Sequence, residues 1–569
     1  MSSAALADQA AVLAAWQQRL QAATGAVQRI ETHASVVLLA GGFAYKVKKA
    51  IDLGFLDFRT LERRRHYCDE ELRLNRRTAP ELYLDVLPLT GAAAAPELGG
   101  SGPVLDWVLR MRAFDGAGLW DRLAARGALR PAMIDALAAE VAALHRGAAV
   151  AGADEPAGQP AAIRALVTDS LRTLDARCTE PAQRARLAAL RAWVERSGER
   201  LEPVFVERLR AGRVCDGHGD LHLGNVTEHA GRTRLFDALE FDRALRIADA
   251  ISDVAFVAMD LRAHALPRLA HRFVDAYLVH TGDYDGLRVL RWYELHRALV
   301  RAKVAALRAA QLEPADVAAA AQAHAAAARY LDTAEALCAR DRSAAANDDA
   351  ATVALGTPRG AAPVEPHAAA PAAACGAAPP LLLTHGLPGS GKTLLTQSLL
   401  ELIGAVRVRA DVERKRLFGL APLARAQGEQ QRELYGRAAG EATLERLCAV
   451  ATIALRAGYP VILDSTFGSR AARARVLGLA AVLGAPALIL DFRAPPELLR
   501  ERVRARATRA DDASDAGPDE LALLQAAAEP LAASELAHCE AVDAALPFDE
   551  AAMPARWAPL LRRLGLDAG

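Results

Sequence analysis

Apolar runs and helical patterns alternate along the last third of the chain. Runs within 381–383, 405–411, 458–464 and 485–491 have the length of buried strands, and helical stretches separate them. This alternation predicts a parallel, doubly wound sheet with helices around it. Functional sites in such sheets lie at the carboxyl ends of the strands.

Shorter strands joined by tight turns are predicted in the first half of the chain. Residues 35–49 read as two strands joined across Gly41 and Gly42, and residues 226–237 read as a strand, a glycine turn and a strand. Side chains alternate along the second strand of the first pair, so Lys46 and Lys48 point to one side of it.

Between residues 341 and 379 both patterns disappear. Ala and Pro dominate this segment, and large apolar residues almost vanish. Too little apolar surface is present to offset the entropy of ordering, so we predict a flexible linker. It divides the chain into an N-terminal domain at 1–340 and a C-terminal domain at 380–569.

The composition excludes some function classes. Lys+Arg and Asp+Glu both total 69, so no global charge favours nucleic acid or an anionic membrane surface. The seven Cys show no metal or disulfide spacing, and the N-terminus has no pattern of a secretory signal. No apolar stretch is long enough to span a bilayer. We therefore expect a cytoplasmic protein.

The first apolar run of the C-terminal domain leads into a phosphate-binding motif. The sequence G-x-x-x-x-G-K-T lies between a predicted strand and a predicted helix, which is the context of a Walker A P-loop. Lys392 is predicted to reach the β- and γ-phosphates of ATP, and the Thr393 hydroxyl to complete the shell of a Mg²⁺ ion. The cofactor-binding residues are Gly386, Gly389, Ser390, Gly391, Lys392 and Thr393.

Charged residues follow the next strands of this domain. Asp411 lies at the end of the second run, suited to take a proton from an acceptor hydroxyl, and Asp464 ends the third, suited to support the magnesium. Arg502, Arg506 and Arg509 are spaced to share one helical face. They would clamp phosphates as a lid closes, or they form a solvated helix; the spacing favours neither.

These motifs resemble the small P-loop kinases related to zeta toxins and polynucleotide kinases. The resemblance covers 380 to about 550. It implies that Asp411 of D-x-x-R is the catalytic base, that Arg414 lies beside the substrate, and that Arg506 belongs to an Arg-rich lid.

The segment 214–226, VCDGHGDLHLGNV, concentrates polar side chains in the N-terminal domain. His218 and His222 have the spacing of a helical zinc motif, but Gly219 and Gly224 disfavour a helix and no Glu lies beside either His. The alternative is a phosphotransfer loop of the form H-x-D-x-x-x-x-N. A second metal carboxylate should then follow a short hairpin, and Asp237 does so.

This arrangement assigns roles along the N-terminal domain. Asp220 is the predicted base, and Asn225 and Asp237 the predicted ligands of Mg²⁺. Lys46 would grip the α- and β-phosphates of ATP. Its carboxylate partner is predicted to be Glu71, with Glu70 as the rival.

Together these residues resemble the aminoglycoside phosphotransferase family, a branch of the protein-kinase-like fold. The resemblance covers roughly 25–340 and implies a bilobal α+β domain in which Asp253 braces the catalytic loop. One departure is the segment F-D-A-L-E-F, in which Glu240 adds a carboxylate near the metal. No G-x-G-x-x-G loop precedes Lys46, which argues against a protein kinase.

The two resemblances imply a bifunctional ATP- and Mg²⁺-dependent kinase that transfers phosphate to hydroxyl groups of small-molecule acceptors. The alternative is a single N-terminal kinase regulated by a nucleotide-binding P-loop ATPase domain. No membrane partner is expected. Nucleic acid is disfavoured as a partner, although a nucleic-acid end stays open as an acceptor for the P-loop domain.

Overall fold

The structure is a computed structural model. It describes residues 2–354 and 378–566, apart from positions 33, 53, 55, 179, 313–315, 427, 508–512, 547 and 550–552. At the helical positions 2–5, 341–354 and 506–507 it describes only the backbone.

Contacts divide the chain into two compact units. The first unit contains Met1–Asp169 and Gly198–His264, and the second contains Ser170–Ser197 and Ala265–Gly569. The predicted domain boundary after residue 340 does not match this division. Residues 265–340 belong to the same unit as the P-loop sheet rather than to the unit that holds the catalytic loop.

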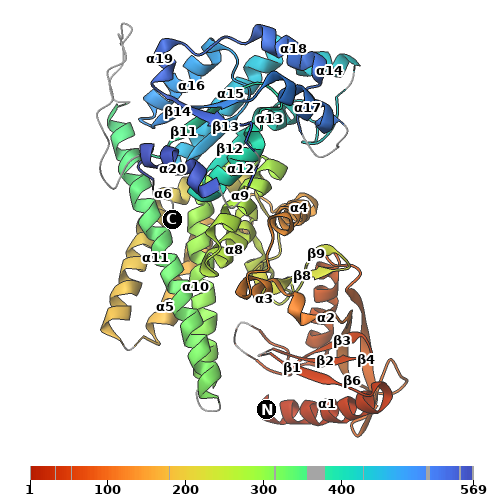
Figure 1. The fold of residues 1–569 in the computed structure, drawn as a ribbon. Helices are drawn as coiled ribbons and strands as arrows, with labels where there is room; N and C mark the ends of the chain where they lie inside the picture. Colours follow the sequence, from red (N-terminus) through yellow and green to blue (C-terminus); the bar gives the residue numbers. More distant parts are fainter. Residues whose placement is uncertain are drawn as a thin grey trace. The chain divides into compact units, whose positions relative to one another are not determined.

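The first unit begins with an antiparallel sheet of order β1-β2-β3-β6-β4-β5 (Figure 1). Helix α1 (Ser2–Thr24) packs through Trp16 against Tyr45, with ring centres 5.5 Å apart. Helix α2 (Leu61–Asn75) packs through Cys68 with Ala44 and Leu109. The strands are β1 (Gln28–Glu31), β2 (Ser35–Ala40), β3 (Phe43–Lys48), β4 (Tyr83–Ala92), β5 (Ala95–Leu98) and β6 (Val104–Arg112).

Helices and two short strand pairs complete the first unit. Strand β7 pairs with β10 in antiparallel orientation, and β8 pairs with β9 as the predicted glycine hairpin. These elements are α3 (Trp120–Ala125), α4 (Pro131–Gly147), β7 (Val214–Asp216), β8 (Val226–His229), β9 (Arg232–Leu235), α7 (Arg243–Arg246), β10 (Ile247–Asp249) and α8 (Ala250–Ala263). Helices α5 (Pro160–Asp175) and α6 (Pro181–Arg210) run from one unit into the other.

The second unit contains a five-stranded parallel sheet of order β12-β13-β11-β14-β15. The prediction of a doubly wound parallel sheet is confirmed. Its strands are β11 (Leu381–His385), β12 (Val406–Arg409), β13 (Val461–Asp464), β14 (Ala487–Arg493) and β15 (Cys539–Asp543). The sequence patterns indicated the first four strands and missed β15.

Helices cover both faces of this sheet. Helices α12 (Lys392–Ile403) and α20 (Met553–Arg563) pack on the face that carries Leu382. Leu381 points to the other face and is also fully buried, and α15 (Arg437–Arg456) and α16 (Arg470–Val482) contact β13 and β11. The remaining helices are α13 (Ala410–Leu417), α14 (Gly428–Leu434), α17 (Pro496–Ala507), α18 (Pro518–Ala527) and α19 (Ala533–Leu536).

Three helices that precede the low-complexity segment also belong to the second unit. They are α9 (Pro267–Thr281), α10 (Leu287–Leu312) and α11 (Val317–Ala354). Helix α11 extends into the predicted 341–379 linker, and residues 355–377 of that linker lie outside the described residues.

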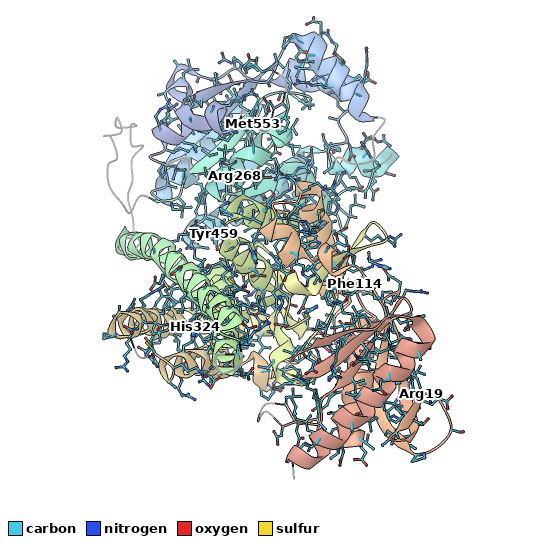
Figure 2. The ribbon with its side chains drawn as sticks, turned by 60° about the horizontal axis from the view of Figure 1, so that its bottom comes forward. Arg19, Phe114, Arg268, His324, Tyr459 and Met553 are labelled. Carbon is cyan, nitrogen blue, oxygen red and sulfur yellow. The ribbon has the colours of Figure 1, made fainter. Side chains whose placement is uncertain are left out.

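Buried polar contacts hold α9 and α10 against the P-loop sheet and its helices. The Asp275 carboxylate on α9 accepts a hydrogen bond from the backbone N–H of Arg407 on β12 at 2.8 Å. On α10, the Arg291 guanidinium donates to the carbonyl of Gly458 at 2.8 Å. It also lies over the ring of Tyr459, labelled in Figure 2, with 4.6 Å to the ring centre. These contacts explain why residues 265–340 group with the P-loop domain.

We expect Asp275→Ala to destabilise the P-loop domain. Asp275 is 4% exposed, and its removal leaves the Arg407 backbone N–H and the buried guanidinium without this carboxylate. Breaking such a buried pair costs about 3–5 kcal/mol of unfolding free energy. Urea unfolding measures the change. Asp285→Ala is the matched control, because the Asp285–Arg288 pair is partly exposed and should matter by less than about 1 kcal/mol. Equal effects of the two variants would show that the Asp275 contact has no special role in the stability of the P-loop domain.

No helix among the described residues is both long enough and apolar enough to cross a membrane.

Candidate active sites

The P-loop connects β11 to α12 and needs its glycines. Gly386 has φ of +141°, and a Cβ there would lie 2.7 Å from the carbonyl oxygen of Phe492. Gly389 has φ of +83°, and a Cβ there would lie 2.8 Å from the carbonyl oxygen of Leu499. Other residues are therefore strained and obstructed at both positions. Ser390 is buried and Gly391 precedes the first residue of α12, so the loop leads directly into a helix N-terminus.

The reactive side chains of the P-loop lie at the start of α12. The Lys392 ammonium donates to the carbonyls of Gly386 and Leu387, both at 2.9 Å, so it curls back over the loop. The Thr393 hydroxyl donates to Asp464 at 2.7 Å. The sequence placed Thr393 and Asp464 at one magnesium site, and the fold brings them into contact at the end of β13.

The predicted acceptor side of this site lies on α13. The Arg414 guanidinium donates to the Asp411 carboxylate at 2.9 Å, so the pair sits together in the first turns of the helix that follows β12. Both side chains are partly exposed.

The arginine-rich segment divides into a described and an undescribed part. Arg502 on α17 donates to the carbonyl of Ala544 at 2.8 Å. Arg506 lies on the last turn of α17, but its side chain is outside the described residues, and so is the whole of Arg509. The predicted lid therefore stays a prediction.

The predicted catalytic loop of the first unit follows β7, and the buried carboxylate of Asp253 holds its first residues. Asp253 on α8 accepts the backbone N–H groups of His218 at 2.7 Å and Gly219 at 3.0 Å. His218 contacts the carbonyl of Phe236 through its ring at 3.0 Å. Burial lowers the pKa of His218, with Asp253 opposing this shift, so the ring is neutral near pH 7 and orients the loop.

The loop brings its predicted base, Asp220, and the predicted metal ligand Asn225 together. The Asn225 amide donates to the backbone carbonyl of Asp220 at 2.8 Å and to its carboxylate at 3.2 Å. The carbonyl of Asn225 accepts the N–H of Phe236 at 3.1 Å, so Asp237 follows immediately beside the loop. His222, for which the sequence suggested no firm role, lies 3.5 Å from the Asp220 carboxylate.

Asp237 adopts a left-handed backbone conformation, which hydrogen bonds with surrounding residues stabilise. Its φ is +60°, which is uncommon for a residue other than glycine. Its N–H donates to the hydroxyl of Tyr83 at 3.0 Å, and the next N–H, of Ala238, donates to the side chain of Asn75 at 2.8 Å. Neither Tyr83 nor Asn75 was identified from the sequence.

Lys46 on β3 joins two of the predicted residues. Its ammonium lies 2.7 Å from Glu71 on α2 and 2.6 Å from Asp237. Glu70, the rival partner, pairs instead with Arg73 at 2.6 Å. The predicted phosphate-binding lysine and the predicted metal carboxylate therefore share one site.

A second lysine, missed in the sequence, extends this network. Lys48 is buried and contacts both Glu71, at 2.7 Å, and Glu240. Burial alone would raise the pKa of Glu71, but the ammonium groups of Lys46 and Lys48 outweigh it and hold that pKa at about 2. Glu240, which the sequence placed near the metal, is thus directed to Lys48. The sequence did contain a signal for the role of Lys48, because alternation along the strand places Lys46 and Lys48 on the same face.

Glu71→Ala is expected to lower the unfolding free energy by about 3 kcal/mol, because the buried Lys48 ammonium and the partly buried Lys46 ammonium lose their shared carboxylate. Asp69→Ala is the matched control on the same helix. Asp69 and its partner Arg65 are both exposed, so the expected loss is about 1 kcal/mol or less. Chemical denaturation of both variants compares the two losses. A control as damaging as Glu71→Ala would remove the special role of Glu71.

Among the residues that the structure describes, no group of three or more His, Cys, Asp or Glu is arranged to hold a metal ion. His218 and His222 lie in a loop rather than on one helical face.

Comparisons with known proteins bear on both halves of the chain. A family model described as an AAA domain matches residues 381–531. An uncharacterized protein of Mycobacterium tuberculosis is 30% identical over 486 residues, covering 85% of this chain and 87% of the relative. An uncharacterized protein of Mycobacterium bovis matches to the same extent.

Solved structures of kinases were also found. A choline/ethanolamine kinase family protein from Mesorhizobium loti has a TM-score of 0.36 and 16% identity, and the match covers 57% of this chain and 99% of that one. A putative kinase from Chloroflexus aurantiacus has a TM-score of 0.25 and 21% identity, covering 32% of this chain and 98% of that one.

The two folds and their sites join a protein-kinase-like domain to a P-loop domain. The lysine–glutamate pair beside the loop after β7 marks the first, and the P-loop with its Thr393–Asp464 contact marks the second. The chain belongs to the family of the mycobacterial proteins named above, which it matches over most of its length.

Proposed function

We propose that the protein carries two ATP- and Mg²⁺-dependent phosphotransfer sites, each acting on a hydroxyl group of a small-molecule acceptor. One observation carries the proposal: in each unit the predicted phosphate-binding lysine and the predicted acceptor carboxylate both contact other residues of the predicted site. In the first unit these are Lys46 and Asp220, and in the second Lys392 and Asp411. A site that only binds nucleotide has no need of the carboxylate.

The donor sets suit magnesium at both sites. Oxygen ligands from carboxylate, amide and hydroxyl groups are those that Mg²⁺ prefers. Asn225 and Asp237 would hold the ion in the first site, and Thr393, with Asp464 behind it, in the second. A bound Mg²⁺ supplies positive charge to the oxygens of the β- and γ-phosphates.

The chain's own residues would then position and deprotonate the acceptor. Asp220 would take the proton of the acceptor hydroxyl as its oxygen bonds to the γ-phosphorus and the bond between that phosphorus and ADP breaks. Lys46, fixed by Glu71, would hold the α- and β-phosphates. Asp411 and Lys392 would divide the same tasks in the P-loop domain.

A single kinase regulated by the P-loop domain is the second candidate. It is favoured by the packing of Tyr284, which precedes α10, against Glu413 on α13, the helix that also carries Asp411. Residues 265–340 could in this way sense the occupancy of the P-loop domain.

A metabolite screen tests the proposal. The full chain is incubated with ATP, Mg²⁺ and a library of hydroxylated metabolites, and products are detected by the mass gain of one phosphate. Asp220→Asn and Asp411→Asn variants serve as mutual controls. Two products, each lost in one variant only, are the expected result, whereas one product lost only in Asp220→Asn would favour the regulatory candidate.

A further inference from the structure

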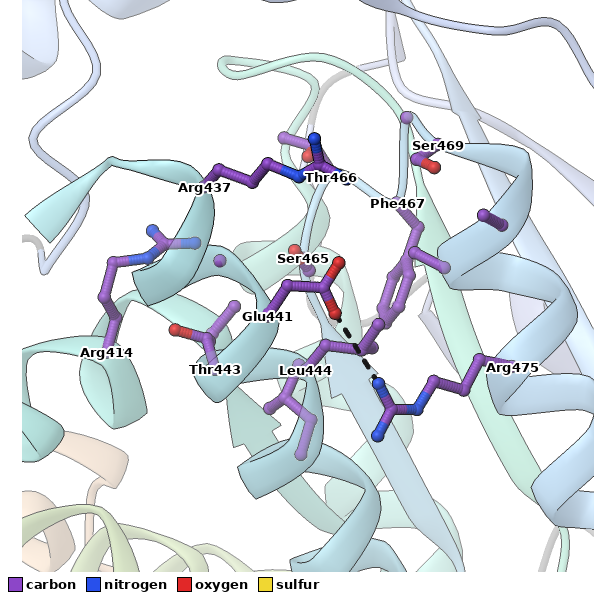
Figure 3. Close-up of a pocket in the computed structure, with 16 residues that line it drawn as sticks. Arg414, Arg437, Glu441, Thr443, Leu444, Ser465, Thr466, Phe467, Ser469 and Arg475 are labelled. Atoms are coloured by element: carbon purple, nitrogen blue, oxygen red, sulfur yellow. Dashed lines mark ion pairs between the residues drawn. The ribbon is translucent and has the colours of Figure 1, made fainter.

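A pocket of about 390 Å³ lies beside Asp411 in the P-loop domain (Figure 3). Helix α13 lines it through Ala410 and Arg414, the loop after β13 lines it through 465–469, and α15 and α16 line it on either side. Its size suits a small molecule, since ligand pockets commonly range from about 300 to 1,000 Å³.

Charged side chains give this pocket a positive character. Its lining contains Arg414, Arg437, Arg475 and one carboxylate, Glu441. Glu441 lies 3.7 Å from Arg475, the ion pair drawn as a dashed line in Figure 3. Glu441 therefore does not neutralise the other two arginines of the lining, Arg414 on α13 and Arg437 on α15.

Both of these arginines have hydrogen-bonding capacity to spare. The Nε atom of Arg414 is buried and has no hydrogen-bond partner, although the same guanidinium donates to Asp411. A buried donor without a partner costs free energy, which a ligand acceptor would recover. Arg437 is exposed, and among the described residues it has neither an ion pair nor a hydrogen-bond partner.

Two helices also begin at the pocket. Helix α15 starts at Arg437 and α16 at Arg470, and neither has a side-chain cap from the residue before it. Helix N-termini carry partial positive charge and favour anions. The N–H of Arg470 is already taken by Glu529, so α15 offers the freer terminus.

The loop between the helices is held in a fixed shape. Phe467 has φ of +42°, a strained conformation for this residue type. Its carbonyl accepts a hydrogen bond from the buried Arg473 at 3.0 Å, and Arg473 in turn pairs with Glu535 at 2.7 Å. The pocket wall is thus braced independently of any ligand.

We infer that the acceptor of the P-loop site is a small alcohol that already carries an anionic group, either a phosphate ester or a carboxylate. This inference rests on the proposed kinase activity of the P-loop domain. Arg414 and Arg437 bind the anion, and the 2.9 Å contact between Arg414 and Asp411 places the acceptor hydroxyl at Asp411. Asp411 takes the hydroxyl proton, the oxygen bonds to the γ-phosphorus of ATP, and ADP leaves.

Binding is tested first, without turnover. The full chain with Asp411→Asn is mixed with glycerol, glycerate and glycerol 3-phosphate, and with mannitol, gluconate and mannitol 1-phosphate, and ligand-detected NMR reports binding. In each series we expect an anionic member to bind and the neutral polyol not to bind. Arg437→Gln should weaken that binding by about 30-fold, the loss typical of a charge-assisted contact. Arg456→Gln, at the other end of α15 and outside the pocket lining, is the matched control.

Turnover is tested second, in the full chain with Asp220→Asn, so that the P-loop site alone contributes. We expect phosphorylated products only from anionic acceptors, with Arg437→Gln raising the KM for the acceptor and leaving the KM for ATP unchanged. Carboxylate and phosphate acceptors are compared separately to identify the anion.

The outcomes separate the inference from the proposed function. Anionic binding that depends on Arg437, without turnover of any acceptor, would refute the kinase activity and keep the anion site. Efficient turnover of neutral polyols, unaffected by Arg437→Gln, would keep the kinase and overturn the inference. Absence of any binding would overturn it as well, and so would preferred phosphorylation of the 5′-hydroxyl of an oligonucleotide, because the acceptor would then be a nucleic-acid end.

Discussion

Asp411→Asn is expected to abolish phosphorylation by the P-loop site while leaving its affinity for nucleotide nearly unchanged. The carboxylate lies on α13 and contacts Arg414, whereas the Lys392 ammonium contacts carbonyls of the P-loop. Loss of a positioned base costs about 10²–10⁴-fold in rate. Lys392→Ala should instead damage both nucleotide binding and turnover, because Lys392 contacts phosphates before and during transfer.

Measuring both reaction products and nucleotide affinity in the two variants separates catalysis from regulation. If the P-loop domain only senses nucleotide, Asp411→Asn is silent and Lys392→Ala changes the rate of the Asp220-dependent reaction. Asp519→Asn on α18, an exposed position, controls for the loss of a carboxylate. A silent Asp411→Asn variant would refute the second kinase activity.

The corresponding change in the first unit, Asp220→Asn, should lower the rate of its own reaction by about 10²–10⁴-fold. ATP binding should persist, because Lys46, Glu71 and Asp237 keep their contacts. The Asn225 side-chain amide donates a hydrogen bond to the Asp220 carboxylate. In the variant it can donate to the side-chain carbonyl oxygen of the new asparagine instead, so the loop should keep its shape.

Single-turnover kinetics on a verified acceptor, together with ATP titration, checks this expectation. Asp154→Asn, an exposed position in the same unit, is the control. Wild-type turnover in Asp220→Asn would remove Asp220 from the role of base.

Features of the sites that are local in sequence could be predicted from the sequence. An apolar run, a glycine-rich turn and a helix are contiguous, so the P-loop and its flanking elements followed from the pattern. The spacing of Asp237 behind a short hairpin was informative for the same reason. Strand β15 was missed because only Val542 of its five residues is buried, which leaves no readable alternation.

Features that depend on distant residues could not be predicted. Tyr83 and Asn75 hold the backbone around Asp237 from more than 150 positions away, and nothing in their own neighbourhood indicates this. Glu240 could be placed near the metal by spacing, but its partner Lys48 is visible only in the folded chain. Asp275 lies on a helix that reads as amphipathic, and its burial against Arg407 was equally hidden.

The second unit contains chain segments from both sides of the Ala/Pro-rich region, which affects how such genes can be rearranged. A gene divided in the Ala/Pro-rich region would place 265–340 on one polypeptide and the P-loop sheet on another, although both belong to one compact unit. The products would have to reassemble before the P-loop half regained its packing at Asp275. We therefore expect recombination that exchanges the P-loop half between relatives to keep 265–340 together with the P-loop sheet rather than to break in the region of weakest sequence complexity.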